Sequence, residues 1–335
     1  MQIGKHNTDD KVFLIAEIGN NHEGDFDLAR EMVRRAVETG VEAVKFQVFR
    51  TEEYVASSDS VRFESLKGFE LTPGQFAQLA HQSHDAGVAF IATPFDLSSA
   101  DLTAEICDAI KIASGDNTFY PLIEKVAACD KPAILSTGML DVKGLQRPYG
   151  ILAEALGEDN LALLHCVTSY PVEPKDANVA VVRTLMKGFG CEIGYSDHTL
   201  DAEACLAAVA CGARIIEKHF TLDHNYSDFR DHQLSANPVE MADLVKRVRL
   251  LETLLGSGDK FASRSEAEIE PSVRRSIVTR RELSAGHVLV EKDLTWVRPA
   301  GGMAPGRESE LVGNSLRYAV MAGHQLCLED VEKPT

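Results

Sequence analysis

Apolar runs of strand length recur through the first three quarters of the chain, and helix-like segments separate them. The eight runs are Val12–Ile18, Glu42–Gln47, Val88–Thr93, Ala109–Ser114, Ala133–Ser136, Leu161–Cys166, Cys191–Tyr195 and Arg214–His219. Segments with apolar residues at helical spacing lie between or after them, among them Phe26–Thr39, Pro73–Ala86, Leu122–Cys129, Ala202–Cys211 and Pro238–Leu255. Strands that alternate with helices pair in parallel, and near-continuous apolar strands are typical of a sheet covered on its outer side. Eight such units predict a (β/α)8 barrel.

The pattern changes after Leu255. Gly256–Pro271 begins with two glycines around a serine and continues as a polar stretch, which is typical of a linker. The rest shows short β-like pieces separated by turn signals, namely Ser276–Thr279, His287–Leu289, Leu294–Val297 and Leu316–Val320. We therefore expect a barrel over residues 1–256, a linker over 257–271 and a small β-rich domain over 272–335. No short sequence repeat is evident.

One connection in the barrel is much longer than the others. Phe49–Thr72 follows the second predicted strand and precedes the next predicted helix. Connections of this length are uncommon in compact domains unless they are functional. We expect this segment to form a flap over the mouth of the barrel.

Polar side chains follow or end each of the eight predicted strands. They include Glu17, Lys45, Thr93, Asp96, Lys111, Ser114, Ser136, His165, Ser196, His198, Glu217 and His219. A single inward lysine or serine is most often a satisfied core group. Burying so many polar groups together, however, costs several kcal/mol unless they pair with one another or bind a ligand. In barrels of this kind the reaction site lies at the C-terminal ends of the strands, so the set predicts an active site there.

The residue types indicate which ligands this site would take. Two lysines and several hydroxyl groups suit a ligand that carries a phosphate and a carboxylate. His198 and His219, at the ends of neighbouring strands, could supply two imidazoles to one divalent ion, although two strand-end histidines without a metal are an equally good interpretation. Few protein ligands would leave coordination positions open for water and substrate.

Composition narrows the classes of function. The formal charge of −17 disfavours nucleic acid as a partner, because binding a phosphate backbone needs a basic face. The seven cysteines are scattered and form no CxxC pair, which disfavours a disulfide framework or a zinc ribbon. The first residues contain no apolar signal-peptide core, and no later run is long enough to span a membrane. We expect a cytoplasmic protein.

At the strand ends the sequence resembles the sialic acid synthase family. The resemblance is carried by Ala16-Glu17-Ile18-Gly19-Asn20-Asn21-His22-Glu23-Gly24, Val44-Lys45-Phe46-Gln47, Ala92-Thr93-Pro94-Phe95-Asp96, Lys111-Ile112-Ala113-Ser114-Gly115, Ser136-Thr137-Gly138-Met139, Gly194-Tyr195-Ser196-Asp197-His198-Thr199 and Glu217-Lys218-His219-Phe220-Thr221-Leu222-Asp223. The tail from Arg274 to Pro299 resembles the antifreeze-like (SAF) domain of that family. The similarity runs in order along nearly the whole chain.

The resemblance implies a role for each matching residue. His198 and His219 would bind Mn2+ or Mg2+, with a slight preference for Mn2+. Phosphoenolpyruvate would be held by Lys45, Thr93, Lys111, Ser114, Ser136, Thr168 and Ser196, and the sugar would face Glu17, Tyr170 and Asp231. The family forms dimers that exchange the small domain, so Arg298 would reach the partner's site and contact the acylamino group of the sugar.

The chain departs from the family pattern in three places. Asp116 stands where the family usually has a glutamate, and Thr168 stands where some relatives carry an amide residue. Phe229-Arg230-Asp231-His232 replaces Gly-Pro-Asp-His, which adds a ring and a cation. Arg230 would either meet an acidic group on the substrate or pair with Asp228 or Asp231. The changes at Asp116 and at Phe229-Arg230 leave the identity of the sugar open.

The expected reaction is a metal-dependent, aldol-type condensation of phosphoenolpyruvate with an N-acylated amino-sugar aldehyde and water, giving a sialic-type acid and phosphate. In it Lys45 and Lys111 would neutralise and position phosphoenolpyruvate, and Glu17 or Asp116 would steer protons. The sugar could be N-acetylmannosamine, its 6-phosphate or a diacetamido-trideoxy hexose.

Three other readings stay open. The protein could be another phosphoenolpyruvate-dependent synthase that uses a phosphorylated sugar, although the SAF-like tail argues against it. It could be a Schiff-base aldolase that uses Lys111 or Lys45. The third is a non-catalytic sugar-binding protein.

Overall fold

The eight predicted strands form one closed parallel barrel in the computed structural model, which describes residues 1–334. Their order around the barrel is β10-β3-β4-β5-β6-β7-β8-β9. The bounds are β3 Phe13–Gly19, β4 Ala43–Val48, β5 Ala89–Pro94, β6 Ala109–Ile112, β7 Ala133–Ser136, β8 Leu161–Cys166, β9 Glu192–Asp197 and β10 Ile215–His219. The predicted (β/α)8 barrel is confirmed.

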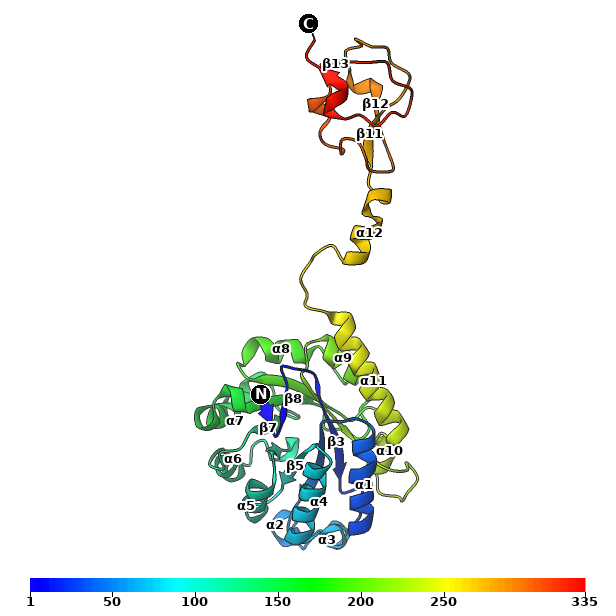
Figure 1. The fold of residues 1–335 in the computed structure, drawn as a ribbon. Helices are drawn as coiled ribbons and strands as arrows, with labels where there is room; N and C mark the ends of the chain where they lie inside the picture. The colour runs from blue at the N-terminus through cyan, green and yellow to red at the C-terminus, as the bar shows by residue number, and fades with distance from the viewer. Residues whose placement is uncertain (335) are drawn as a thin grey trace. The chain divides into compact units, whose positions relative to one another are not determined.

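Helices surround these strands (Figure 1). They are α1 Phe26–Glu38, α2 Thr51–Tyr54, α3 Ser60–Phe69, α4 Pro73–Asp85, α5 Leu97–Ile106, α6 Tyr120–Ala127, α7 Val142–Leu156, α8 Val181–Gly188, α9 Glu203–Ala210, α10 Asp231–Leu234 and α11 Pro238–Leu255. All five helical segments named from the sequence are present within two residues of their expected ends, and α11 has the expected bounds.

Side-chain caps set where several of these helices begin. Thr72 and Gln75 form a capping box at the start of α4, and Asn237 and Glu240 form another at the start of α11. Each pair satisfies backbone N–H groups that have no partner within the helix. Asp96 follows strand β5 but caps α5, accepting from Ser99 N at 2.6 Å. Its place after a strand therefore reflects helix capping rather than chemistry.

Side chains alternate along the strands and form three groups. Outward residues are apolar, inward residues near the strand starts are also apolar, and inward residues near the strand ends are polar. Outward residues such as Leu14, Val44 and Phe90 pack against the helices in the main hydrophobic core. Inward residues near the strand starts, such as Phe13 and Ile91, form a second cluster inside the barrel. A small hairpin of β1 (Gln2–Ile3) and β2 (His6–Asn7) adds Ile3 to that cluster. The polar inward residues near the strand ends make up the polar inner ring.

The chain divides into two compact units, Met1–Gly256 and the part that begins at Ser257. Within the segment predicted as a linker, α12 (Arg264–Val273) begins at a capping box of Ser263 and Glu266. The second unit then has two antiparallel pairs, β11 (Ser276–Thr279) with β12 (Leu294–Val297), and β13 (Ser315–Leu316) with β14 (Val331–Glu332). Ten buried apolar side chains make its own core. Thr335, the last residue of the expected domain, lies outside the described residues.

Two of the β pieces expected in this unit are shorter than predicted. His287–Leu289 forms only an isolated bridge from Val288 to Ser315, and Leu316–Val320 is a strand only at its first residue, which belongs to β13. The chain turns tightly here, because Gly286 and Gly323 have φ values of 79° and 83°. Long ladders do not form between such closely spaced turns.

The same two turns belong to a short sequence repeat, contrary to the expectation of none. Ala285-Gly286-His287 and Ala322-Gly323-His324 each precede an aspartate six residues after the histidine. His287 Nε2 lies 2.7 Å from Asp293 Oδ2, and His324 Nε2 lies 3.1 Å from Asp330 Oδ2. Both aspartates also accept a backbone N–H three residues earlier. These histidines therefore have structural partners inside the small unit.

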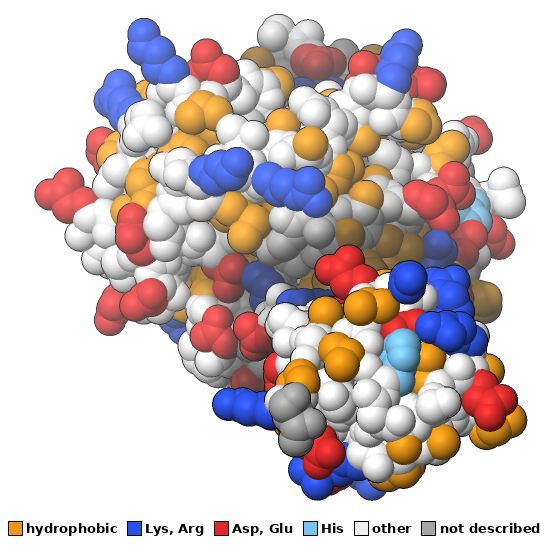
Figure 2. All heavy atoms as spheres, turned by 90° about the horizontal axis from the view of Figure 1, so that it is seen from above, with side chains coloured by type: hydrophobic (Ala, Val, Ile, Leu, Met, Phe, Trp, Pro, Cys, Tyr) orange, Lys and Arg blue, Asp and Glu red, His pale blue; other side chains and the backbone are white. Residues whose placement is uncertain are grey.

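Acidic and basic side chains are interspersed over the face shown in Figure 2, so on that face the net charge of −17 is spread rather than gathered. All seven cysteines are free thiols. Within residues 1–334, no helix combines the length and the apolar character that crossing a bilayer requires.

Candidate active site

A cavity of about 580 Å³ opens at the C-terminal ends of the barrel strands. Its floor is the polar inner ring, in which neighbouring strands place Glu17, Lys45, Thr93 and Lys111 side by side. Lys45 Nζ donates to Thr93 Oγ1 at 3.1 Å. Because side chains alternate along a strand, each of these residues points inward while its chain neighbours pack outward. Parallel strands thus bring residues from distant parts of the sequence into one ring.

Two lysines and two glutamates form a buried ionic cluster at the centre of this ring. Lys45 Nζ lies 3.1 Å from Glu17 Oε2 and 3.4 Å from Glu217 Oε2. Lys111 Nζ lies 3.3 Å from Glu217 Oε1. All four side chains are almost fully buried, and buried charges persist only when they are paired or bind a ligand.

The protonation states in this cluster follow from burial and neighbours. Burial raises the pKa of Glu17, and the nearby Lys45 offsets this only in part. Burial alone would raise the pKa of Glu217 too, but Lys111 and Lys45 outweigh it and hold that pKa well below its usual value. Burial also lowers the pKa of Lys111. Glu217 is therefore the fixed anion of the cluster, and Glu17 is the carboxyl group that can hold a proton.

Two hydroxyl groups meet at a glycine beside this cluster, and a third lines the same cavity. Gly138 N donates to Ser114 Oγ at 3.1 Å. A side chain at Gly138 would collide with Ser114 Oγ and with Thr168 Oγ1, so only glycine allows this approach. Ser136 Oγ is buried and has no hydrogen-bond partner among the described residues. A buried hydroxyl without a partner is costly unless a ligand supplies one, so the group is suited to oxygen atoms of an anion.

The two predicted metal-ligand histidines lie next to each other at the cavity wall. The ring centroids of His198 and His219 are 5.4 Å apart. His198 Nδ1 lies 2.9 Å from the carbonyl oxygen of Val167, which can only accept, so Nδ1 carries a proton and Nε2 is the nitrogen left for another partner. His219 Nδ1 is buried without a partner in the part of the chain that the structure describes. Burial, His198 and Lys45 hold the pKa of His219 well below its usual value, so this ring is neutral.

This pair fits a divalent metal ion. The ring centroids are 5.4 Å apart, so the two imidazoles are close enough to be ligands of one ion. Within residues 1–334, no group of three or more His, Cys, Asp or Glu side chains is arranged around one metal position. The fit therefore rests on the two imidazoles, with water and substrate as the other ligands.

Tyr170 and the segment Phe229-Arg230-Asp231, which differs from the family pattern, make a second wall of the cavity. The Tyr170 ring lies 4.1 Å from the His198 ring, and the Arg230 guanidinium lies 4.5 Å from the centre of the Tyr170 ring. Arg230 Nε is 3.3 Å from Asp231 Oδ1. Of the two interpretations left open for Arg230, the structure shows the pair with Asp231.

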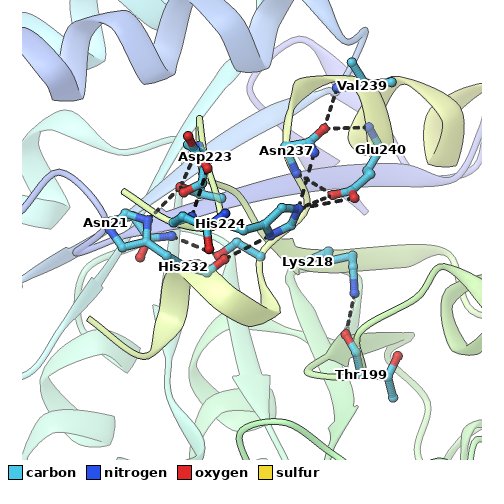
Figure 3. Close-up of polar contacts among 12 residues, drawn as sticks. Asn21, Thr199, Lys218, Asp223, His224, His232, Asn237, Val239 and Glu240 are labelled. Carbon is cyan, nitrogen blue, oxygen red and sulfur yellow. Dashed lines mark hydrogen bonds and ion pairs between the residues drawn. The ribbon is translucent and has the colours of Figure 1, made fainter. Parts of the chain in front are cut away.

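Buried hydrogen bonds hold this wall in place. His232 Nδ1 is 2.7 Å from Thr221 Oγ1, and His232 Nε2 is 2.9 Å from Glu23 Oε1. Asn21 donates to Ser235 Oγ at 2.9 Å, and Figure 3 shows Asn21 and His232 converging from different segments. The loop after β3 and the loop after β10 are thus tied together, which fixes Asp231 at the cavity.

The long connection Phe49–Thr72 covers the cavity from the side of α3, as the flap prediction requires. Its residues Tyr54, Asp59, Val61, Arg62, Ser65, Leu66 and Phe69 line the cavity. Tyr54 stacks on Phe95 at 4.5 Å, and Phe69 meets Phe229 edge-on at 5.2 Å. The flap is therefore held by aromatic contacts at its two ends.

Most of the predicted site residues lie together. The cavity is lined by Glu17, Lys45, Thr93, Lys111, Ser114, Ser136, Thr168, Tyr170, Ser196, His198, His219 and Asp231. Asp116 is half-buried in the turn after β6, beside the lining residue Gly115 but not itself part of the lining. Arg298 belongs to the second unit and is not among the lining side chains.

The sequence reading gave no role to Glu217, Cys166 or the flap residues. Glu217 shares the inward face of β10 with His219 two positions on, so the strand period alone could have identified it. Cys166 follows by the same rule, and the outward position of His165, which contacts the carbonyl oxygen of Ala177, agrees with it. The flap residues carry no comparable signal.

Two segments of the chain match known families. Residues 32–260 match the NeuB family, and residues 274–332 match the SAF domain. An uncharacterised protein of Methanocaldococcus jannaschii is 43% identical over 293 residues, which cover 87% of this chain and 86% of that protein. The N,N'-diacetyllegionaminic acid synthase of Legionella pneumophila is 38% identical over 337 residues, which cover 96% of this chain and 94% of that enzyme.

A solved structure is similar over most of its length. It is the N-acetylneuraminic acid (sialic acid) synthetase of Leptospira borgpetersenii serovar Hardjo-bovis, crystallised with citrate. Its sequence is 34% identical, the TM-score is 0.75, and the match covers 80% of this chain and 94% of that chain.

Proposed function

The chain belongs to the NeuB family, and on that premise we propose that it condenses phosphoenolpyruvate with the open-chain aldehyde of an N-acylated amino sugar. Water is the third reactant, and the products are a nonulosonic acid and inorganic phosphate. Two of the relatives named above, from Legionella pneumophila and Leptospira borgpetersenii, are synthases of such acids. The enzyme class is therefore a transferase that forms a carbon–carbon bond.

The observation that carries the proposal is the cationic, hydroxyl-lined ring inside an acidic protein. Lys45 and Lys111 are buried together in a chain whose formal charge is −17. Beside them Ser136 Oγ has no partner within residues 1–334, and Ser114 and Thr168 surround Gly138. A small ligand with a phosphate and a carboxylate would satisfy these donors, because ammonium and hydroxyl groups bind both kinds of anion.

The sugar would lie between the histidine pair and the second wall. Tyr170 and Asp231 offer an aromatic surface and a carboxylate, as expected for a polar ring-opened sugar. Relatives make N,N'-diacetyllegionaminic acid and N-acetylneuraminic acid, so both a diacetamido-trideoxy hexose and N-acetylmannosamine are candidate substrates.

The reaction balances with this set of residues. Carbon 3 of phosphoenolpyruvate forms a bond to the aldehyde carbon, and the aldehyde oxygen becomes an alkoxide that takes a proton. Glu17 is the carboxyl group that can hold that proton, because burial raises its pKa. Carbon 2 is left positively charged, and water adds there and gives one proton back to Glu17. The intermediate then expels phosphate as the bond between carbon 2 and the phosphate oxygen breaks, and the remaining hydroxyl proton leaves with the phosphate. Lys45 and Lys111 keep the anion next to the aldehyde, so their contribution is mainly positioning.

His198 and His219 would hold a divalent ion, Mn2+ or Mg2+. When bound, such an ion polarises the aldehyde carbonyl and stabilises negative charge on its oxygen. The neutral His219 ring and the free Nε2 of His198 support this assignment.

We also propose a homodimer that exchanges its second unit. Arg298, which follows β12, would then contact the acylamino group of sugar bound in the partner's barrel. The match of residues 274–332 to the SAF domain supports this part of the proposal.

Phosphate release from phosphoenolpyruvate, measured with a panel of aldoses, tests the function. The panel contains N-acetylmannosamine, its 6-phosphate, a diacetamido-trideoxy hexose and arabinose 5-phosphate, each with Mn2+ and again with EDTA. We expect release that needs both an N-acylated aldose and the metal. Release with arabinose 5-phosphate alone would place the protein among the synthases that use phosphorylated sugars. Binding of sugar without any release would favour the non-catalytic alternative.

One observation favours a Schiff-base aldolase as the second candidate. Burial lowers the pKa of Lys111, which brings that amine closer to a nucleophilic state. Its contact with Glu217, however, keeps the ammonium form favourable. Borohydride treatment in the presence of pyruvate distinguishes the two, since only an imine would be trapped as a covalent adduct detected by mass spectrometry. We expect no adduct.

A further inference from the structure

A buried ion pair outside the cavity has no part in the chemistry described so far. Lys218 Nζ lies 2.7 Å from Asp197 Oδ2 and donates to the carbonyl oxygen of Thr199 at 2.8 Å. Both charged side chains are almost inaccessible to solvent. Figure 3 shows the Lys218 ammonium group directed at Thr199.

The pair lies directly behind the two histidines. Strands β9 and β10 are paired so that Ser196 faces Glu217 and Asp197 faces Lys218. Since side chains alternate, Ser196 and Glu217 point into the barrel and share a hydrogen bond of 2.8 Å. Asp197 and Lys218 point outward. One residue further along both strands, His198 and His219 face the cavity again.

Charged side chains such as Asp197 and Lys218 are unusual on the outward side of the barrel strands. The outward positions of the other strands hold apolar side chains of the main core, apart from His165 on β8. Removing two charges from water costs about as much as their attraction returns, so a buried pair is weak evidence for a gain in stability. An apolar pair would serve the core equally well. The charged pair therefore calls for a role other than packing.

The hydrogen bonds of Asp197 hold the segment that carries His198. Thr199 N donates to Asp197 Oδ1 at 3.0 Å, and Thr199 Oγ1 lies 3.1 Å from Oδ2. Tyr195 OH and Cys205 Sγ reach the same carboxylate at 3.2 Å and 3.3 Å. With Lys218 bound to Thr199 as well, the residues on both sides of His198 are tied to the strand that carries His219.

We infer that Asp197 and Lys218 are positioning residues that set the spacing of His198 and His219 for a divalent cation, an inference that rests on the proposed function. The ion pair locks β9 to β10 at the point where both histidines project. Groups that orient the ligands of a metal commonly change metal affinity by about 10- to 100-fold when they are removed.

The test is Mn2+ affinity, measured on apo-protein by electron paramagnetic resonance, which reports free and bound Mn2+ directly. Three proteins are compared with the wild type. Lys218→Met removes the ammonium group, and Asp197→Asn with Lys218→Met removes both charges, so that no lone charge is left buried. The control is Glu42→Gln with Arg249→Met, because that pair, at 2.7 Å, joins a buried carboxylate to helix α11 and does not link β9 to β10.

We expect both Lys218 variants to lose at least about tenfold in Mn2+ affinity. The control should keep wild-type affinity while its melting temperature falls. Phosphoenolpyruvate affinity, measured by calorimetry without metal, should stay within about threefold of wild type in every variant. The reason is that none of these substitutions changes Lys45, Lys111 or the hydroxyl groups beside them.

Two results would overturn the inference. One is wild-type Mn2+ affinity in the double variant, and the other is an equal loss of affinity in the Glu42 control, which would indicate a general effect of destabilisation. Failure of the wild type to bind Mn2+ is a different outcome, because it removes the metal from the proposed function and the inference with it. If Lys218→Met does not fold, the charge-neutral double variant decides.

Discussion

Two glutamates of the inner ring have opposite charge states because their neighbours differ. Glu17 has one lysine within 3.1 Å, and burial dominates its pKa, which is raised. Glu217 contacts Lys45 and Lys111 together, and their charges outweigh the same burial. At the scale of the residue, two side chains of the same type therefore differ in protonation state. The number and distance of their charged neighbours decide which one is the fixed anion.

His219→Ala tests the histidine pair. The variant should lose at least about a thousandfold in phosphate release with Mn2+, because a Lewis acid contributes several kcal/mol to stabilising charge in the transition state. Its fold, followed by circular dichroism, should survive. His84→Ala is the control, since that imidazole pairs with Asp108 elsewhere. Near-normal turnover by His219→Ala in metal-free buffer would contradict the metal role.

Asp116→Asn tests a carboxyl group whose environment opposes its charge. Burial raises the pKa of Asp116 to about 6. At pH values between the pKa of Asp116 in the unfolded chain and its pKa in the folded protein, the folded state binds more protons than the unfolded state. The free energy of unfolding therefore falls as the pH rises through this range. The asparagine variant should therefore match wild type at pH 4 and be more stable at pH 8 by about 1 kcal/mol, allowing for partial access of solvent.

Thermal melts at pH 4 and pH 8 measure this difference. The same stability change at both pH values would show that Asp116 is not the titrating group. Phosphate release by the same variant separates the two roles considered for Asp116. A strong loss of turnover would assign it to proton transfer despite its position beside the cavity.

At the scale of the element, α3 is unlike the other long helices of the barrel unit. None of its ten residues is buried, yet six residues of the segment Asp59–Phe69 line the cavity. A helix without a buried face gains little from packing, so its position depends on a few contacts at its ends. The edge-on contact of Phe69 with Phe229 links it to the loop after β10.

Phe69→Ala should weaken sugar use without unfolding the protein. An aromatic pair contributes about 0.5–1.5 kcal/mol, so we expect KM for the sugar to rise by roughly two- to tenfold while the melting temperature changes little. Phe229→Ala should have a similar effect, and the double variant should be no worse than either single one, because both remove the same contact. Glu64→Ala, on the exposed side of α3, is the control.

Fully additive losses would show that the two rings act separately. Equal changes in KM for phosphoenolpyruvate and for the sugar would show that the flap does not act on the sugar side alone. Steady-state kinetics with each substrate varied in turn give both values.

At the scale of the whole molecule, the residues proposed for one reaction belong to two compact units. The cavity lies within Met1–Gly256, and Arg298 lies in the unit that begins at Ser257. In an exchanged dimer each site would combine a barrel from one chain with Arg298 from the other.

Mixing two inactive variants tests this arrangement. Arg298→Ala and His219→Ala should each be strongly impaired. After subunit exchange in an equal mixture, random pairing leaves about a quarter of all sites with both residues, so activity should return to about that fraction. An affinity tag on one variant confirms that subunits have exchanged, because the untagged variant is then retained with it. No recovery after exchange would count against swapping.

The sequence alone determined the barrel and most of its reactive ring. Period-two alternation and helical spacing are local properties, so eight strands and the helices between them could be recognised from short windows. Parallel strands in a barrel end at one face, and this rule predicts from the sequence that Lys45, Lys111, Ser136 and His219 lie together. The same rule covers Glu217, to which the sequence analysis assigned no role.

Only the tertiary structure decided the rest. The flap residues Arg62 and Phe69 reach the cavity through contacts with distant segments, and no local period records such contacts. The ion pair of Asp197 with Lys218 depends on the register of β9 against β10, which is a property of two strands and not of either one. The charge states of Glu17 and Glu217 depend on which lysines lie near them, and that is known only when the barrel is closed.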